Sequence, residues 1–390
     1  MPFIGNKPTA VPLTSADLED NIISTAKIQD DAVTTAKTSY SDAPFRNIII
    51  NGDMSIAQRG TSVSSITTSG YYTLDRWELG FTSLGTWTMS QDSDVPTGQG
   101  FAKSLKLDCT TADASPDSAD VMRLSQKFEG QNLQYLKKGT ASAVSLTASF
   151  WVKSTKTGTF ILELQDTDNN RGISKSYTVN TTNTWEKKTI TYEGDTTGAF
   201  NNDNGTSLQL NFFLGTGSAR TSGTLATSWE SLTTGNRAVG QVNLADSTSN
   251  DFWITGVQLE AGTTASDFEF LPYDVNLGRC QRYYFQINSE NSFGAIGSGV
   301  YKSTTACRVT LTYPKIMRAT PTISGTNIGN TLVSQGGDKT PTGSLTVYNH
   351  KDKATIDVTT NSATLSTGCI WIFGGSSASV QGNAELWLIQ

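Results

Sequence analysis

The chain contains a single histidine, His350, and this limits the acid–base chemistry that the sequence can support. A Ser-His-Asp or Cys-His arrangement needs an imidazole beside its nucleophile, so it would have to use His350. His350 lies in the segment Tyr348–Asp352, whose polar residues are typical of a turn between two strands. Metal sites built on histidine need several imidazoles. We therefore assign no catalytic residue and expect a protein that is not an enzyme.

Paired carboxylates are the chemistry that the sequence leaves open. A glycoside hydrolase needs only two of them, about 5–10 Å apart. With 35 Asp and Glu residues, some pair will always look suitable, and the sequence does not single one out. A depolymerase that acts on a polysaccharide therefore stays an alternative.

Exposed aromatic side chains are a second kind of candidate, because sugar rings stack on aromatic faces. Trp229 lies in the polar segment 215–250, which we predict to be mainly loop, and Tyr71 and Tyr72 lie in a Ser/Thr-rich stretch. We predict that these three residues bind a glycan. The alternative for Trp229 is a plug over the edge of a β-sandwich. Trp253 lies within a strand pattern and is predicted to pack in a core.

A weak calcium motif is the third candidate site. Asp166, Asp168 and Asn170 place side-chain oxygens at alternate positions, as calcium loops do. Gly172 comes one place late for an EF-hand loop, however, and Tyr177 stands where that loop has a glutamate. The alternative is an Asx-type turn. We predict no other cofactor.

The elements that must position these residues are predicted to be β-strands. Only 16% of the residues are charged and 35 are glycine, which suits short strands joined by polar turns. In Ser207–Leu214 every second residue is apolar, and the intervening Ser207, Gln209 and Asn211 are polar. A period of two indicates a half-buried strand. Further strands are predicted at 47–50, 149–152, 159–165, 252–259, 308–313, 345–348, 354–358, 370–373 and 384–389.

We predict an all-β fold with two domains. Many short strands without a helical pattern between them imply antiparallel sandwiches. We expect an antiparallel jelly-roll sandwich over residues 46–275 and a second, smaller β-sandwich over residues 276–390, because the pattern breaks after Leu271–Tyr273 and then restarts.

Residues 1–45 differ from the rest of the chain and are predicted to form an extended segment. They contain no Trp and no Cys, and Asp20–Lys27 recurs ten residues later as Asp30–Lys37. Such a segment cannot bury a core by itself. It is therefore expected to order against a partner or against copies of itself.

Several other classes of protein fit the sequence poorly. The net charge is −6, so we expect no nucleic-acid partner. No apolar run is long enough to span a membrane, and no signal peptide is expected. The four cysteines, Cys109, Cys280, Cys307 and Cys369, are scattered, so we predict buried free thiols rather than zinc or a disulfide framework.

A family resemblance appears in several strings taken together. Asn47–Gly60 followed by Leu74–Trp77 resembles the start of a domain common in phage tail-fibre and virion proteins. Phe252–Gly262, with the later Phe268–Tyr273 and Arg279–Tyr284, is similar to the same group. The region 149–259 also looks like a carbohydrate-binding-module jelly roll, and Met317–Thr322 fits the group as well.

The resemblance implies a place in a virus particle. It implies a homotrimeric tail fibre, located in the virion tail, whose C-terminal β-sandwich binds a host-surface glycan or protein. The N-terminal repeats resemble segments by which such fibres dock to a tail adaptor or nozzle. The residues carried over for this attachment are Ile22, Ile23, Lys27, Val33 and Lys37. The alternatives are a head fibre, a decoration protein, a glycan-binding module of another system, or a depolymerase acting on host polysaccharide.

Overall fold

The computed structural model describes residues 45–288, 295–303, 305–326, 331–334, 346–359, 369–372 and 379–386. The predicted attachment residues Ile22, Ile23, Lys27, Val33 and Lys37 lie outside these ranges. Residues 45–390 belong to one unit of the chain. Within the described residues, no helix has the length and apolar character needed to cross a membrane.

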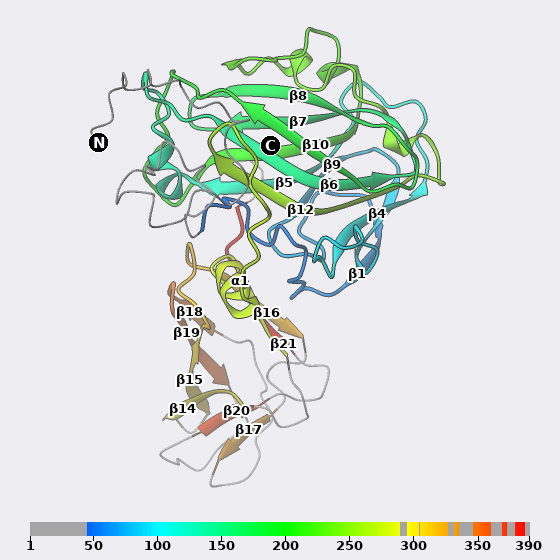
Figure 1. Ribbon diagram of the computed structural model, residues 1–390. Coiled ribbons are helices and arrows are strands. Elements are labelled where there is room, and N and C mark those ends of the chain that lie inside the picture. The colour runs from blue at the N-terminus through cyan, green and yellow to red at the C-terminus, as the bar shows by residue number, and fades with distance from the viewer. Residues whose placement is uncertain are drawn as a thin grey trace, which may run out of the picture. The chain divides into compact units, whose positions relative to one another are not determined.

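Two six-stranded antiparallel sheets form the larger sandwich, and Figure 1 shows them as stacked layers. Sheet A has the order β1 (Ser62–Ile66), β3 (Thr86–Asp92), β4 (Ser104–Thr111), β12 (Asp251–Ala261), β6 (Leu146–Ser154), β9 (Glu186–Tyr192). Sheet B has the order β11 (Glu230–Ser231), β8 (Arg171–Val179), β7 (Gly158–Asp166), β10 (Thr206–Thr216), β5 (Val121–Glu129), β2 (Glu78–Thr82). Late strands lie between early ones in both sheets, as in a jelly roll. The prediction of an all-β antiparallel sandwich is therefore confirmed.

The apolar face of β10 shows how the strand pattern makes the core. Leu208, Leu210 and Phe212 are fully buried between the sheets, as their alternation predicts. The ring of Phe212 contacts Phe150 of β6 edge to face, with ring centroids 5.0 Å apart, so the two sheets interlock at this point. Full burial of side chains of this size contributes about 1.5–3 kcal/mol each.

Asn47–Ile50, predicted as a strand, is not one. Its backbone instead follows β12, where the amide of Ile48 donates to the carbonyl of Leu259 at 2.8 Å. Gly52 sits so close to β12 that a Cβ atom there would lie 2.0 Å from the carbonyl oxygen of Val257. The glycine of the Asn51-Gly52 pair therefore allows two backbones to approach closely. The periodicity of the sequence does not predict such a contact.

The smaller sandwich follows the helix α1 (Tyr273–Gln281), which the sequence analysis did not predict and which contains the expected domain boundary. A three-stranded sheet has the order β13 (Tyr284–Asn288), β21 (Ser379–Asn383), β16 (Thr322–Thr326). A six-stranded sheet has the order β17 (Thr331–Ser334), β20 (Cys369–Ile372), β14 (Ala295–Ser303), β15 (Ala306–Thr312), β19 (Lys353–Thr359), β18 (Thr346–Asn349). Residues of both sheets, among them Phe285 and Val309, share one apolar core.

The remaining described elements are short, and the cysteines correct one expectation. The 3-10 turns are Gly130–Asn132, Gln134–Leu136, Ser218–Arg220, Thr234–Asn236 and Leu244–Asp246. Cys109 and Cys280 are buried free thiols, as predicted, but Cys307 is disulfide-bonded. Scattered spacing hid this bond because strand pairing, rather than sequence distance, decides which cysteines meet.

Candidate functional site

The polar face of β10 is the first sign of a site. Ser207, Gln209 and Asn211 point away from the core, and the alternation predicts that they face solvent. They are instead at most 2% exposed. A buried polar face on the outside of a sheet needs hydrogen-bond partners and a cover. Gln209 and Asn211 have such partners, whereas the hydroxyl of Ser207 has none among the described residues.

A cleft of about 890 Å³ lies over this face of sheet B. Its floor is formed by four neighbouring strands of this sheet, β7, β10, β5 and β2. Residues of the long 217–250 segment line it as well, and Glu385 and Leu386 contribute to its lining. The 217–250 segment is held over the sheet by an apolar cluster in which Ala238 packs with Phe213, so the predicted loop covers part of the cleft.

A hydrogen-bonded network fixes the floor of the cleft. The guanidinium of Arg237 donates to both carboxylate oxygens of Glu163, at 2.7 and 2.6 Å, and to Gln165 Oε1 at 2.8 Å. Asn211 Nδ2 donates to Glu163 Oε2 at 2.8 Å, and Gln209 Nε2 donates to Asn211 Oδ1 at 2.8 Å. These contacts hold the amide groups of the floor in fixed orientations before any ligand arrives.

Ion pairs hold the other side of the floor. Lys127 of β5 pairs with Glu78 of β2 and also donates to the carbonyl of Leu386 at 2.7 Å. Burial lowers the pKa of Lys127 to about 8, although the charge of Glu78 opposes this shift. Glu385 pairs with the buried Arg76 and with Arg59. The carboxylates at this side of the cleft are therefore engaged with cations.

The three predicted glycan-binding aromatics do not line the cleft. Tyr71 is buried, and its hydroxyl donates to the carbonyl of Leu386 at 2.8 Å. Tyr72 is half-buried, and its hydroxyl donates to the carbonyl of Thr68 at 2.7 Å. Trp229 packs against the main core beside β11, and its indole donates to the carbonyl of Glu193 at 2.8 Å. This placement matches the alternative for Trp229, a plug over the sandwich edge.

The calcium candidates form an Asx-type turn. Asp166 is fully buried, and its carboxylate accepts from the backbone amides of Asp168 and Asn169. The ammonium of Lys138 lies 2.5 Å from Asp166, so a lysine supplies the positive charge there. Both carboxylate oxygens of Asp168 accept hydrogen bonds from Asn201, and Asn170 has a left-handed φ of 50°. The described residues contain no cluster of three or more groups suited to a metal.

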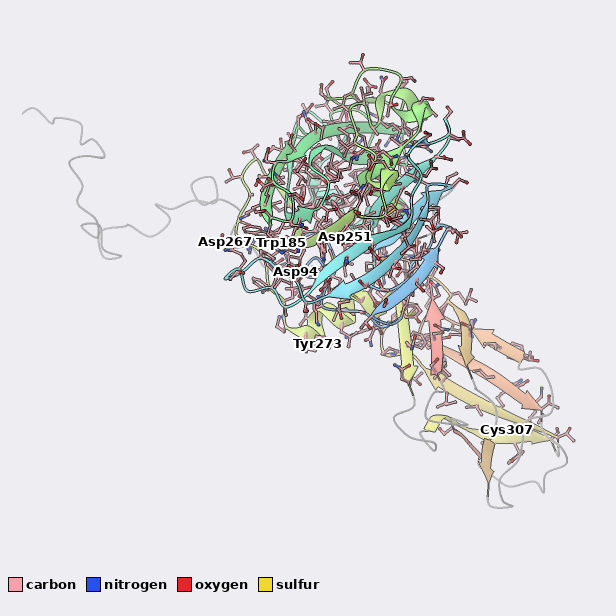
Figure 2. The ribbon with its side chains drawn as sticks, turned by 90° about the vertical axis from the view of Figure 1, so that its right-hand side faces the viewer. Asp94, Trp185, Asp251, Asp267, Tyr273 and Cys307 are labelled. Atoms are coloured by element: carbon pink, nitrogen blue, oxygen red, sulfur yellow. The ribbon has the colours of Figure 1, made fainter. Side chains whose placement is uncertain are left out.

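The outer face of sheet A carries a second polar cluster. Trp253 was predicted to pack in a core, but it lies on this outer face, where the ammonium groups of Lys106 and Lys153 cover its ring at 5.0 and 4.0 Å. Trp253 is only 6% exposed. Figure 2 shows Asp94 beside Trp185, whose indole donates to Asp94 Oδ1 at 2.9 Å. These aromatic faces are engaged by the protein itself, which makes this face a poorer platform for a sugar.

A carboxylate pair on the same face bears on the depolymerase alternative. Asp108 and Asp251 lie opposite each other on β4 and β12. Burial and a hydrogen bond between the two side chains raise the pKa of Asp251 to about 6. Asp251 also pairs with the ammonium of Lys106 at 3.2 Å, so this carboxyl group too is engaged with a cation of the chain. His350 lies exposed in the turn between β18 and β19, as predicted.

The sequence analysis missed both the residues that line the cleft and the network beneath them. The alternation of β10 placed Gln209, which lines the cleft, and Asn211, which supports it, on one face of the strand, and this pattern could have indicated the site. Glu163 and Arg237 are separated by 74 positions, and no local pattern connects them.

Comparison with known proteins gives matches to solved structures only. No protein-family model matches the chain, and no curated protein matches it. The enzymatically active domain of tailspike protein 4 from bacteriophage CBA120 is 14% identical over 56% of this chain and 22% of that chain, with a TM-score of 0.30. The tripod from the baseplate of bacteriophage Tuc2009 is 12% identical over 69% of this chain and 84% of that chain, with a TM-score of 0.26.

Carbohydrate-binding modules also match. A family 11 module from Clostridium thermocellum, solved in complex with a β-1,3-1,4-mixed-linked tetrasaccharide, is 11% identical over 53% of this chain and 98% of that chain, with a TM-score of 0.27. Solved structures similar to this chain thus include phage tail proteins and carbohydrate-binding modules. Similarity at this level carries no argument about function, which has to come from the cleft.

Proposed function

We propose that this chain is a structural component of a bacteriophage particle, a tail fibre that binds a host-surface glycan in the cleft of sheet B. The observation that carries the binding proposal is the buried polar floor of that cleft. Sugar hydroxyls both donate and accept hydrogen bonds, and side-chain amides do the same. Gln165 and Gln209 offer such amides in fixed positions within a concave site of small-molecule size.

Hydrogen bonding, rather than aromatic stacking, would select the ligand. Among the residues that line the cleft the aromatic one is Phe81, which is buried. This revises the sequence-based hypotheses, which sought an exposed tryptophan or tyrosine and placed the contact with the host in the C-terminal β-sandwich. A floor of fixed polar groups discriminates strongly between sugars, because a wrong hydroxyl leaves buried groups unpaired.

Binding without cleavage is the second part of the proposal. A glycoside hydrolase needs a carboxylic acid that can give its proton to the leaving group. Glu163 is held by Arg237, and Glu78 is held by Lys127, so both carboxylates are engaged with cations of the chain itself. Incubating the chain with host polysaccharide and measuring new reducing ends tests this part. Their appearance would favour the depolymerase alternative.

The binding proposal is tested with a glycan array followed by calorimetry. We expect the chain to bind a set of glycans, and Gln209→Ala to weaken binding about two- to tenfold, the value of one hydrogen bond. Thr189→Ala is the control, because Thr189 lies exposed on β9 of the opposite sheet. No binding by the wild-type chain, or equal weakening in both variants, would contradict the proposal.

The place in the particle rests on the sequence resemblance and on the N-terminal segment. We propose that residues 1–45 dock to a tail adaptor or nozzle and that three chains assemble. Removing residues 1–45 is expected to leave both sandwiches folded and to abolish incorporation into particles. A monomeric mass at micromolar concentration would contradict the trimer. An image that locates the chain on the head would favour the head-fibre or decoration-protein alternative.

A further inference from the structure

Arg123 is a buried cation that has no hydrogen-bond or ion-pair partner among the described residues. It lies on β5 and lines the cleft, and only 9% of its surface is exposed. In the described part of the chain its guanidinium makes no hydrogen bond and no ion pair, and its Nε atom is inaccessible to solvent and unpaired. Gly80 of β2 lies directly across from it and places no side chain between the guanidinium and the cleft. A charge buried in this way is costly unless a ligand neutralises it.

Two further arginines lie close to Arg123 in the same cleft. Arg220 donates one hydrogen bond, to the carbonyl of Ala119 at 3.1 Å, while its Nε atom has no partner among the described residues. Arg237 is paired with Glu163. Burial, followed by repulsion from Arg237, lowers the pKa of Arg123 to about 10, so the guanidinium groups sense one another. Three guanidinium groups therefore lie near Glu163 at this end of the cleft, and the other carboxylate that acts on Arg123, Glu78, is paired with Lys127.

We infer that this end of the cleft binds an anionic group, a carboxylate or a phosphate, carried by the glycan. The inference rests on the proposed function and adds the class of sugar to it. A guanidinium presents paired N–H donors that match two oxygens of a carboxylate or phosphate. Its attraction for an anion is stronger in a partly desolvated cleft than in water. The neutral amides of Gln165 and Gln209 would hold the sugar beside the anion.

The first experiment tests for the anion site without a sugar. The melting temperature of the full chain is measured at low salt, with and without inorganic phosphate at millimolar concentration. Phosphate is expected to raise the melting temperature of the wild-type chain but not that of Arg123→Gln. Lys187→Gln, which removes an exposed lysine from β9 of the other sheet, should respond like the wild type. Equal stabilisation of all three proteins would overturn the inference.

The same measurement separates a ligand-binding role from a structural one. Without phosphate, Arg123→Gln should melt at the same temperature as the wild type or higher, because it loses an uncompensated buried charge. A clearly lower melting temperature would mark Arg123 as a structural residue and overturn the inference.

The second experiment identifies the source of the anion. Calorimetry compares oligogalacturonate, its fully methyl-esterified form and poly(glycerol phosphate). At least one acidic probe should bind, and Arg123→Gln should weaken it about ten- to hundredfold, the value of a hydrogen bond to a charged group. The ester should bind at least tenfold more weakly than the acid wherever the carboxylate is the anion recognised.

The outcomes distinguish this inference from the proposed function. Equal binding of the acid and its ester, unaffected by Arg123→Gln, would overturn the anion inference and leave glycan binding intact. Stabilisation by phosphate that depends on Arg123, without binding of any glycan probe or array glycan, would support the anion site and count against the proposed function.

Discussion

Replacing Glu163 with glutamine tests whether the floor of the cleft is held by its buried ion pair. Glu163 is 1% exposed and accepts two hydrogen bonds from Arg237 and one from Asn211. Glu163→Gln keeps the shape of the side chain but leaves the charge of Arg237 uncompensated beside Arg123. Breaking a buried pair in this way costs about 3–5 kcal/mol. This is a large share of the about 5–15 kcal/mol by which folded proteins are typically stable.

Urea unfolding followed by tryptophan fluorescence measures this loss. With a slope of about 3 kcal/mol per molar urea, the midpoint should fall by about 1 M or more. Glu193→Gln is the matched control, because Glu193 is 49% exposed and lies 3.5 Å from Lys175. An exposed pair of this kind contributes about 0–1 kcal/mol.

The double variant Glu163→Gln, Arg237→Met completes the test. It removes the uncompensated guanidinium of Arg237 as well as the carboxylate of Glu163, so it should recover much of the stability that Glu163→Gln loses. A midpoint for Glu163→Gln within 0.3 M or so of the control would refute the reasoning. Arg237→Met is also measured alone. A double variant that loses the sum of the losses of Glu163→Gln and Arg237→Met would refute the reasoning as well, because that result would mean that the two residues do not interact.

Three further predictions concern other parts of the sandwich. The raised pKa of Asp251, about 6, means that the folded protein binds more protons than the unfolded chain between roughly pH 4 and 6, so stability falls as pH rises through that window. In Asp251→Asn, the decrease in the free energy of unfolding across this pH window should be smaller by about 1–3 kcal/mol. Urea unfolding at both ends of the window measures it, and the same pH dependence in the variant and the wild type would contradict the prediction. Gly52→Ala should cost about 3 kcal/mol, because its Cβ would meet the Val257 carbonyl at 2.0 Å; a melting temperature equal to that of the wild type would show that the backbone yields freely. Trp229→Ala should lower stability by about 2 kcal/mol in thermal unfolding and spare glycan binding, whereas selective loss of binding would restore Trp229 as a ligand platform.

Much of the fold could be predicted because side-chain periodicity is a local property. The alternation of Ser207–Leu214 predicted β10 and its core face correctly. The prediction of a strand at Asn47–Ile50 was wrong. This segment lies against β12 and hydrogen-bonds to it through Ile48, but it does not form a strand. The helix Tyr273–Gln281 was missed, since it is short and its apolar residues show no clear helical period.

The candidate site was predicted far less well. Trp229, Tyr71 and Tyr72 were predicted to bind a glycan because aromatic residues in polar stretches of sequence are often exposed. Their exposure depends on which elements cover them, and all three donate hydrogen bonds to backbone carbonyls of the chain itself.

The sequence by itself determined the class of structure: period-two strands, low charge and polar turns specify antiparallel sandwiches whichever strands pair. Only the tertiary structure decided that the polar side of β10 is buried, that Arg237 pairs with Glu163, and that Arg123 has no hydrogen-bond or ion-pair partner within the part of the chain that the structure describes. Strand pairing joins residues tens of positions apart, and burial is the sum of what all other elements cover. A buried charge and its missing partner are therefore properties of the folded chain that no stretch of sequence contains.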